Sequence, residues 1–159
     1  MNKLNRKIPF QYAVENLKDL NWNDILFLLN LGYLEYEAAI EHAKEVIGSI
    51  SEQEKLLVEL IVLSPMEVKE GVLVKEYVAK LANNADEQKI CERAMFLILS
   101  WLYDSKGRFE DLMDAIWSVA EDFNYYPSLA DLYRPYDEPG VIYQDWEKYL
   151  RGEARRWGV

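Results

Sequence analysis

The chain has few of the residues on which most metal sites and nucleophilic enzymes depend. Its 159 residues include one histidine, His42, and one cysteine, Cys91. Zinc sites favour Cys and His ligands, and helical di-iron sites need repeated Glu-x-x-His pairs, so one histidine supplies neither. A disulfide within the chain would need a second cysteine. The composition therefore predicts no metal site, no cofactor and a reducing, cytoplasmic compartment.

Long apolar runs and phosphate-binding loops are also absent. The longest nearly apolar run, residues 94–103, is about half of the roughly 20 residues that a membrane-spanning helix needs. Residues 1–7 are basic, but they lead into Pro9, Gln11 and Glu15 rather than into the apolar core of a signal peptide. The sequence contains no Gly-rich phosphate loop and no Gly-x-Ser-x-Gly elbow. We expect neither secretion nor membrane insertion.

Positive charge is scarce relative to negative charge. Lys and Arg together number 18 against 28 Asp and Glu, which gives a formal net charge of −10. Such a charge repels the phosphate backbone of nucleic acids and the surface of anionic lipids. The balance argues against nucleic-acid and membrane partners and favours a basic macromolecular partner.

The apolar residues that are present indicate one helical domain. Hydrophobic residues make up 50% of the chain and aromatic residues 13%, as in globular proteins, and 159 residues suit a single domain. The prolines and glycines mostly separate segments of helical periodicity, and no segment alternates as a strand does. We predict an all-α fold of about seven or eight packed helices, bundle-like or loosely solenoidal, over residues 1–159, with residues 1–8 irregular.

Capping residues predict the ends of the first helices. Asn21 or Asn23 can begin a short apolar helix that Gly32 ends. The next helix should end at Gly48 and bury one apolar stripe, which consists of Tyr36, Ala39, Ile40, Ala43 and Ile47. His42 falls away from that stripe, so we expect an exposed imidazole.

Later segments continue the helical pattern. Residues 56–63 are apolar nearly all round, which predicts burial on more than one side before Ser64 and Pro65 stop the helix. Asp86 can cap the longest helix, whose apolar centre should be the hub of the core. A last helix should begin at about Tyr143.

Residues 109–127 form the most informative segment, because their apolar and acidic side chains separate onto opposite faces of one helix. The apolar residues at three- and four-residue steps are Leu112, Met113, Ile116, Val119, Ala120 and Phe123, and the polar face holds Asp111, Asp114, Ser118, Glu121 and Asp122. Asn124, Tyr125, Tyr126 and Pro127 follow directly. Carboxylates beside rigid aromatic side chains are expected where a basic protein docks.

No arrangement in the sequence favours catalysis. His42 is expected on a polar surface, and Cys91 lies in an apolar stretch where a cysteine is more often a small buried hydrophobe than a nucleophile. The carboxylates lie opposite an apolar stripe instead of in the apolar pocket that raises the pKa of a general acid. Calcium or magnesium binding by Asp111, Asp114, Glu121 or Asp122 ranks below an ordinary solvated helix face. We therefore expect a protein that is not an enzyme.

Two groups of residues carry a family likeness. The first is Trp22, Ile25, Gly32, Leu34, Ile40 and Ala43, and the second is Trp101-Leu102-Tyr103, Phe109-Glu110-Asp111 and the stretch from Glu121 to Pro127. The pattern resembles a bacterial family catalogued as domain of unknown function twenty-two forty-seven, as far as about Pro135. Leu112 stands where the family pattern has proline, and an additional tyrosine precedes Pro127. The tail after Pro139 lies beyond the resemblance.

The resemblance carries no assigned activity, but members are similar in size and genomic style to the immunity proteins of bacterial competition systems. Our leading hypothesis is a non-catalytic antitoxin that binds and neutralises a cognate, basic toxin domain. Steering by the acidic surface would speed that association. The alternative is a bacterial protein-interaction adaptor unrelated to toxins. The residues expected at the interface are Asp111, Asp114, Glu121, Asp122, Tyr125, Tyr126, Asp137 and Glu138.

The end of the chain is basic, in contrast to the acidic stretch before it. The last helix collects Lys148, Arg151, Arg155 and Arg156 after an acidic stretch. These cations either pair with neighbouring acids, as most surface charges do, or form a second contact surface or a homodimer contact. A homo-oligomer is not predicted.

Overall fold

The computed structural model describes residues 7–48, 53–83, 86–105, 112–124 and 139–158, and for residues 112, 113 and 139–143 it describes the backbone alone. Within these ranges the chain forms nine α-helices and no strand, which confirms the predicted all-α class and gives slightly more helices than expected. The helices are α1 (Phe10–Asn16), α2 (Trp22–Leu31), α3 (Glu37–Val46), α4 (Glu54–Ile61), α5 (Pro65–Glu70), α6 (Val72–Leu81), α7 (Glu87–Asp104), α8 (Leu112–Asp122) and α10 (Pro139–Trp157).

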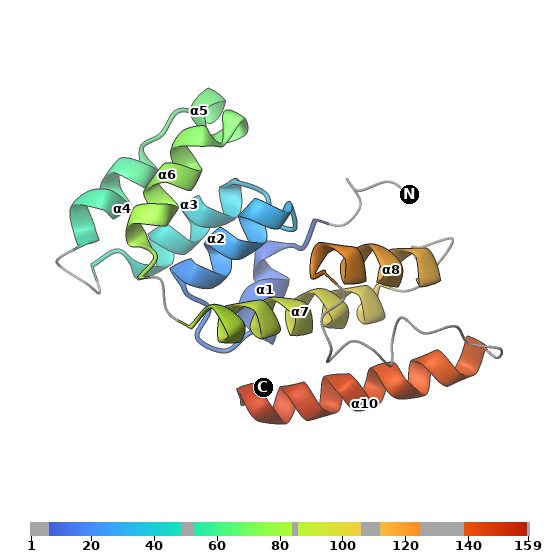
Figure 1. Cartoon of the computed structure of the whole chain (residues 1–159). Coiled ribbons are helices and arrows are strands. Elements are labelled where there is room, and N and C mark those ends of the chain that lie inside the picture. The colour runs from blue at the N-terminus through green and yellow to red at the C-terminus, as the bar shows by residue number, and fades with distance from the viewer. Residues whose placement is uncertain (1–6, 49–52, 84–85, 106–111, 125–138, 159) are drawn as a thin grey trace.

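Helix α7 is the hub of the molecule, as predicted. Every residue from Glu92 to Leu102 is buried, so this part of the helix is covered on all sides. Helices α1, α2 and α10 pack directly on α7, and α8 lies beside its carboxyl-terminal half (Figure 1). On the far side of α2, helices α3, α4, α5 and α6 form the other end of the fold.

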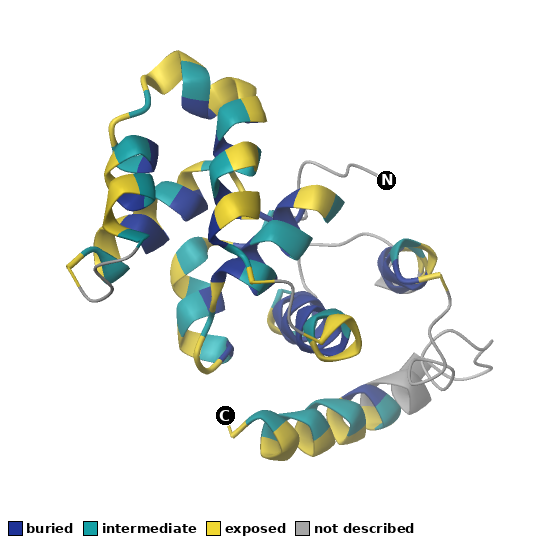
Figure 2. Cartoon of the chain, turned by 60° about the vertical axis from the view of Figure 1, so that its left-hand side comes forward, coloured by how far each residue is buried: buried dark blue, intermediate teal, exposed yellow. Residues whose placement is uncertain are grey.

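One hydrophobic core draws residues from all nine described helices. Figure 2 shows the buried residues on the inward sides of the helices, while exposed residues lie along the outer sides. Helix α10 contributes Trp146, which is completely buried. The described helices therefore pack as a single structural unit.

Several helix ends follow from single residues. Asn21 caps α2 with its side chain, which accepts hydrogen bonds from the amides of Asn23 and Asp24, and Asp24 completes the capping box. Gly32 ends α2 in the left-handed region at φ 82°, as its position predicts. Asp86 caps α7 by accepting from the amides of Gln88 and Lys89.

Other boundaries differ from the prediction. Ser64 and Pro65 begin α5 instead of only stopping the helix before it, because Ser64 forms a capping box with Glu67 and proline is tolerated at the first helical position. Helix α10 starts at Pro139 rather than near Tyr143, and its 19 residues exceed the 18 of α7.

The prediction that residues 56–63 would be buried on more than one side is wrong. Helix α4 buries only Leu57 and Leu60, whereas Val58 is 43% exposed and Val62, which follows the helix, is 70% exposed. An apolar circumference shows that a helix can be buried on several sides, but the number of neighbouring helices decides how many sides are covered.

Candidate functional site

Helix α8 has the two faces that its sequence predicts. Ala115, Ile116, Val119 and Ala120 are buried, and Phe123 stacks on Phe27 of α2 with ring centroids 5.9 Å apart. The side chains of Leu112 and Met113 lie outside the described residues. The apolar face thus fixes α8 on the core and turns its opposite face outward.

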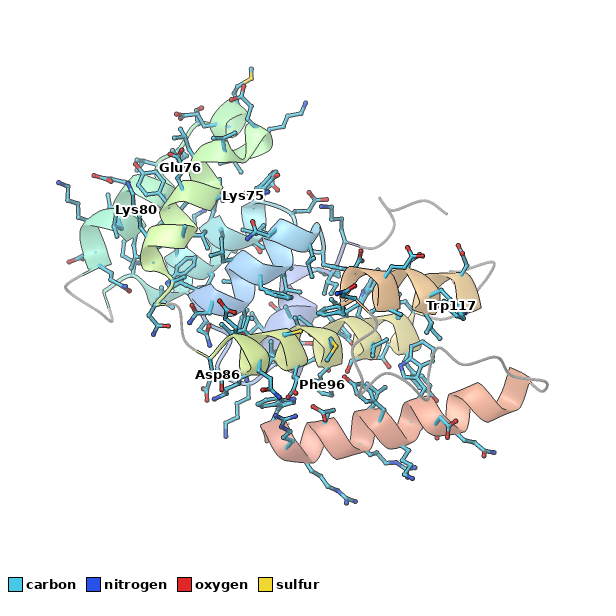
Figure 3. All side chains as sticks on the ribbon, in the orientation of Figure 1. Lys75, Glu76, Lys80, Asp86, Phe96 and Trp117 are labelled. Atoms are coloured by element: carbon cyan, nitrogen blue, oxygen red, sulfur yellow. The ribbon has the colours of Figure 1, made fainter. Side chains whose placement is uncertain are left out.

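The outward face carries an acidic ridge with an aromatic side chain in it. Asp114 and Glu121 are exposed and lie seven residues apart, which places them two turns apart, about 10.5 Å along the helix. Trp117 is 39% exposed and lies between them in the sequence, three residues after Asp114 and four before Glu121. Figure 3 shows Trp117 on α8. We call Asp114, Trp117 and Glu121 the α8 ridge.

Trp117 is the residue that sequence reasoning missed. The apolar and polar faces predicted from the sequence both omit Trp117, although its spacing from Asp114 and Glu121 is that of neighbours on a helix surface. Tryptophan is enriched among the residues that dominate protein interfaces, because it offers a large rigid contact area. A partly exposed indole between two carboxylates is therefore the most distinctive part of this surface.

Asp122 lies on the same helix but does not extend the ridge. Its carboxylate accepts a hydrogen bond from the hydroxyl of Tyr33, a residue that is only 1% exposed. This bond joins the end of α8 to the connection between α2 and α3. The Asp122 carboxylate therefore serves the fold.

The other residues predicted for the interface lie outside the described residues. They are Asp111, Tyr125, Tyr126, Asp137 and Glu138. Of the eight predicted residues, the structure brings Asp114 and Glu121 together on one exposed surface.

The prediction of an exposed His42 is wrong. His42 is 7% exposed and packs edge-on against Trp22, with ring centroids 4.6 Å apart, and against Phe10 at 6.2 Å. Helix α3 buries Ala38, Ala39, His42 and Ala43, a face rotated away from the predicted stripe and toward the Trp22 ring that His42 contacts. Burial lowers the pKa of His42, while Glu45 and Asp24 oppose that shift.

The surroundings of His42 and Cys91 disfavour the charged form of each side chain. Nδ1 of His42 is buried and has no hydrogen-bond partner among the described residues. Cys91 is partly buried, and burial together with the nearby Glu92 carboxylate raises the pKa of its thiol, which disfavours the reactive thiolate. In the part of the chain that the structure describes, no group of three His, Cys, Asp or Glu residues could hold a metal ion.

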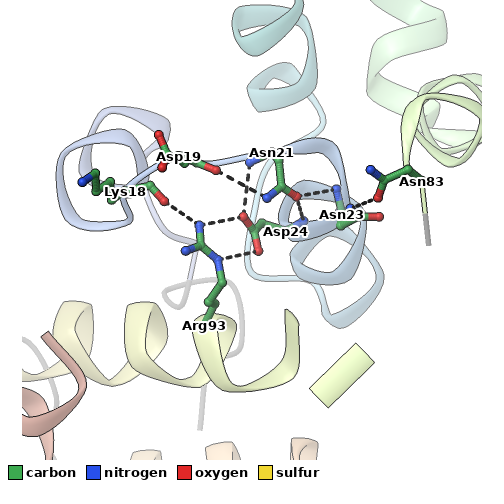
Figure 4. Close-up of polar contacts among 7 residues, drawn as sticks. All are labelled: Lys18, Asp19, Asn21, Asn23, Asp24, Asn83 and Arg93. Atoms are coloured by element: carbon green, nitrogen blue, oxygen red, sulfur yellow. Dashed lines mark hydrogen bonds and ion pairs between the residues drawn. The ribbon is translucent and has the colours of Figure 1, made fainter. Parts of the chain in front are cut away.

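A buried ion pair joins the amino-terminal helices to α7 (Figure 4). Arg93 donates through Nε and one terminal nitrogen to both carboxylate oxygens of Asp24, at 3.2 and 3.0 Å, and to the carbonyl of Lys18 at 2.7 Å. Asp24 is 1% exposed and Arg93 is 7% exposed. Both charges are satisfied within the protein, so this pair orders the corner between α1 and α2.

A surface hollow of about 610 Å³ lies between the start of α1 and α3. It is lined by Pro9, Phe10, Gln11, Glu41, Lys44 and Glu45. Its charged side chains are exposed and of both signs, so water can solvate them. The hollow lacks the convergent, desolvated polar groups of a typical ligand pocket.

The basic residues of α10 are divided between two environments. Arg156 pairs with Glu92 at 2.5 Å and with Glu153 at 3.7 Å, as the interpretation of paired surface charges predicts. Lys148, Arg151 and Arg155 are exposed, and no ion pair or hydrogen bond joins their side chains to any residue that the structure describes.

No helix in the described ranges is both long and apolar enough to cross a membrane. Neither the curated proteins nor the solved structures contain a significant match to this sequence. A family model does match, and it extends the predicted resemblance past Pro135, through most of α10. Because that model, described as an uncharacterized protein conserved in bacteria (DUF2247), covers residues 10–154, the chain belongs to this bacterial family.

Proposed function

We propose that this protein is a non-catalytic immunity protein that binds a basic bacterial toxin domain and blocks it. The observation that carries the proposal is the α8 ridge, where Trp117 lies exposed between Asp114 and Glu121 on a helix fixed to the core. An aromatic anchor flanked by carboxylates suits an arginine- or lysine-rich surface, since the ring contacts the cation and the carboxylates pair with it.

The charge of the whole chain supports the same class of partner. A net charge of −10 attracts basic proteins over a distance and accelerates encounter, and toxin domains that act on nucleic acids are often basic. The family match adds that the chain belongs to a family conserved in bacteria, whose description assigns no activity. The toxin as partner is thus inferred from surface chemistry.

The decisive experiment pairs the protein with the product of the gene adjacent to its own. The two proteins should co-purify, and cells that express the neighbouring product alone should stop growing unless this protein is expressed with it. Absence of both binding and rescue would overturn the proposal. Binding without any toxicity to relieve would support the adaptor alternative instead.

A charge-reversed variant locates the interface. Asp114→Lys with Glu121→Lys should weaken the complex by about tenfold or more, because two attractive contacts become repulsive. The matched control is Glu70→Lys with Glu76→Lys, which changes the net charge equally at two exposed positions of α5 and α6. Equal loss of affinity in both variants would indicate attraction by net charge alone, and circular dichroism checks that both variants fold.

A further inference from the structure

We infer that α10 detaches from α7 while the rest of the fold stays intact, and we call α10 in this role the clasp. Helix α10 packs on α7 and runs in the opposite chain direction, so the start of α10 lies near the end of α7 (Figure 1). Glu92 and Tyr103 of α7 contact α10 directly. Phe96 and Leu99 lie on the same face of α7, since the four residues follow one another at steps of three and four. Figure 3 shows Phe96 on that side of α7.

Polar contacts join α7 and α10 at both ends of their interface. Near the end of α7, Tyr103 donates a hydrogen bond to Glu147 and packs edge-on against Trp146 at 5.1 Å. Near its start, Arg156 pairs with Glu92. Arg156 is about half exposed, so its attraction to Glu92 is weakened by water and by salt.

Docking of α10 also buries polar groups without satisfying them. Nε1 of Trp146 and the hydroxyl of Tyr149 are buried and have no hydrogen-bond partner among the described residues. A buried donor without an acceptor is costly, and it regains water as soon as the helix lifts. Burial also raises the pKa of the Tyr149 hydroxyl, which therefore stays protonated and able to donate.

The carboxyl end of α10 also covers the guanidinium of the buried ion pair between Arg93 and Asp24. The guanidinium of Arg93 lies 5.7 Å from the centre of the Trp157 ring. The same guanidinium donates hydrogen bonds to Asp24 and to the carbonyl of Lys18. Lifting α10 would give Glu92 and Arg93 access to water while leaving the bonds from Arg93 to Asp24 in place. Opening therefore relieves several desolvation costs at once, whereas separating α7 from α2 would relieve none of those at Trp146 and Tyr149.

Hydrogen exchange of the intact protein, read by mass spectrometry, tests the clasp. Amides of α10 from Trp146 to Trp157 should exchange together, at least about tenfold faster than amides of α7 from Ala94 to Leu102, as in sub-global opening. Raising the salt concentration should speed exchange in α10 and leave α7 unchanged. Exchange of both helices at the same rate would overturn the inference.

Two variants and a control sharpen this test. Tyr149→Phe removes the unsatisfied hydroxyl and keeps the ring, so it should slow α10 exchange about fivefold or more. Arg156→Gln removes the pair with Glu92 and should speed it by a few fold, whereas Arg155→Gln, which alters a cation without a described partner, should change it less than twofold. If Tyr149→Phe speeds α10 exchange, or if the variants shift α7 as much as α10, the clasp is refuted.

Discussion

His42 shows how one side chain reverses a sequence-based expectation. Its imidazole lies between Phe10 and Trp22 instead of on the surface, and Nδ1 has no partner among the described residues. Burial in aromatic surroundings disfavours the charged imidazolium, which lowers the pKa of His42 below its ordinary value of 6.5. The only histidine of the chain is therefore a neutral core residue whose protonation opposes folding.

This burial predicts a stability that depends on pH. As the pH falls through about 6.5, the unfolded chain takes up a proton on His42 that the folded chain does not, so the free energy of unfolding should decrease until the pH passes the lowered native pKa. The slope from one such group cannot exceed about 1.4 kcal/mol per pH unit. Urea unfolding at about pH 7 and about pH 5 measures the effect.

The control is His42→Gln, which cannot titrate. Its unfolding free energy should fall less between the two pH values than that of the natural chain. An equal fall in both proteins would assign the pH dependence to carboxylates instead of His42.

At the scale of elements, Gly71 decides how α5, α6 and α3 fit together. It lies between α5 and α6 with φ of 80°, in the left-handed region that favours glycine. A Cβ at this position would lie 2.2 Å from Cζ of Tyr36, the residue that precedes α3. The close approach of Tyr36 and the positive φ both require a residue without a side chain.

Substitution of two glycines should therefore have opposite effects. Gly71→Ala should lower the free energy of unfolding by about 2–4 kcal/mol, from a strained φ and a displaced Tyr36 ring. Gly152→Ala, in the interior of α10 where a Cβ meets nothing within 4 Å, should raise helix stability by about 0.5–1 kcal/mol. Urea unfolding of both variants checks this, and a tolerated Gly71→Ala would contradict the packing of Tyr36 described above.

The helix ends marked by Asn21, Gly32 and Asp86 were more predictable than the buried faces of α3 and α4. Asn21, Gly32 and Asp86 mark boundaries because capping depends on hydrogen bonds within a few residues of the chain. The face that a helix buries depends on its neighbours, which is why α4 and α3 departed from their apolar patterns. Local chemistry fixes the first property and packing fixes the second.

At the scale of the whole molecule, the net charge determines how fast a basic partner is expected to associate. The net charge of −10 surrounds the exposed acids of α8 with a negative field, while Arg93 and Asp24 neutralise each other inside. The field reaches about 10 Å at 0.1 M salt, so it acts on encounter more than on the final contacts.

Association with the product of the adjacent gene should therefore depend strongly on salt. The association rate should fall about tenfold or more between roughly 0.05 and 0.5 M NaCl, with a smaller change in the dissociation rate. Stopped-flow fluorescence can follow both rates through the tryptophans. A rate that does not change with salt would exclude steering and would point to an apolar interface.

The sequence by itself determined the helical class, the role of α7 as hub, several caps, the apolar face of α8 and the family likeness. These properties depend on residue spacing and on contacts between near neighbours in the chain, and both can be deduced from the sequence. Tertiary structure alone decided that His42 is buried, that Asp122 bonds Tyr33, that Trp117 stands exposed and that α10 covers Glu92. Each of these depends on which distant helix lies opposite, and one helix's periodicity cannot specify its neighbours.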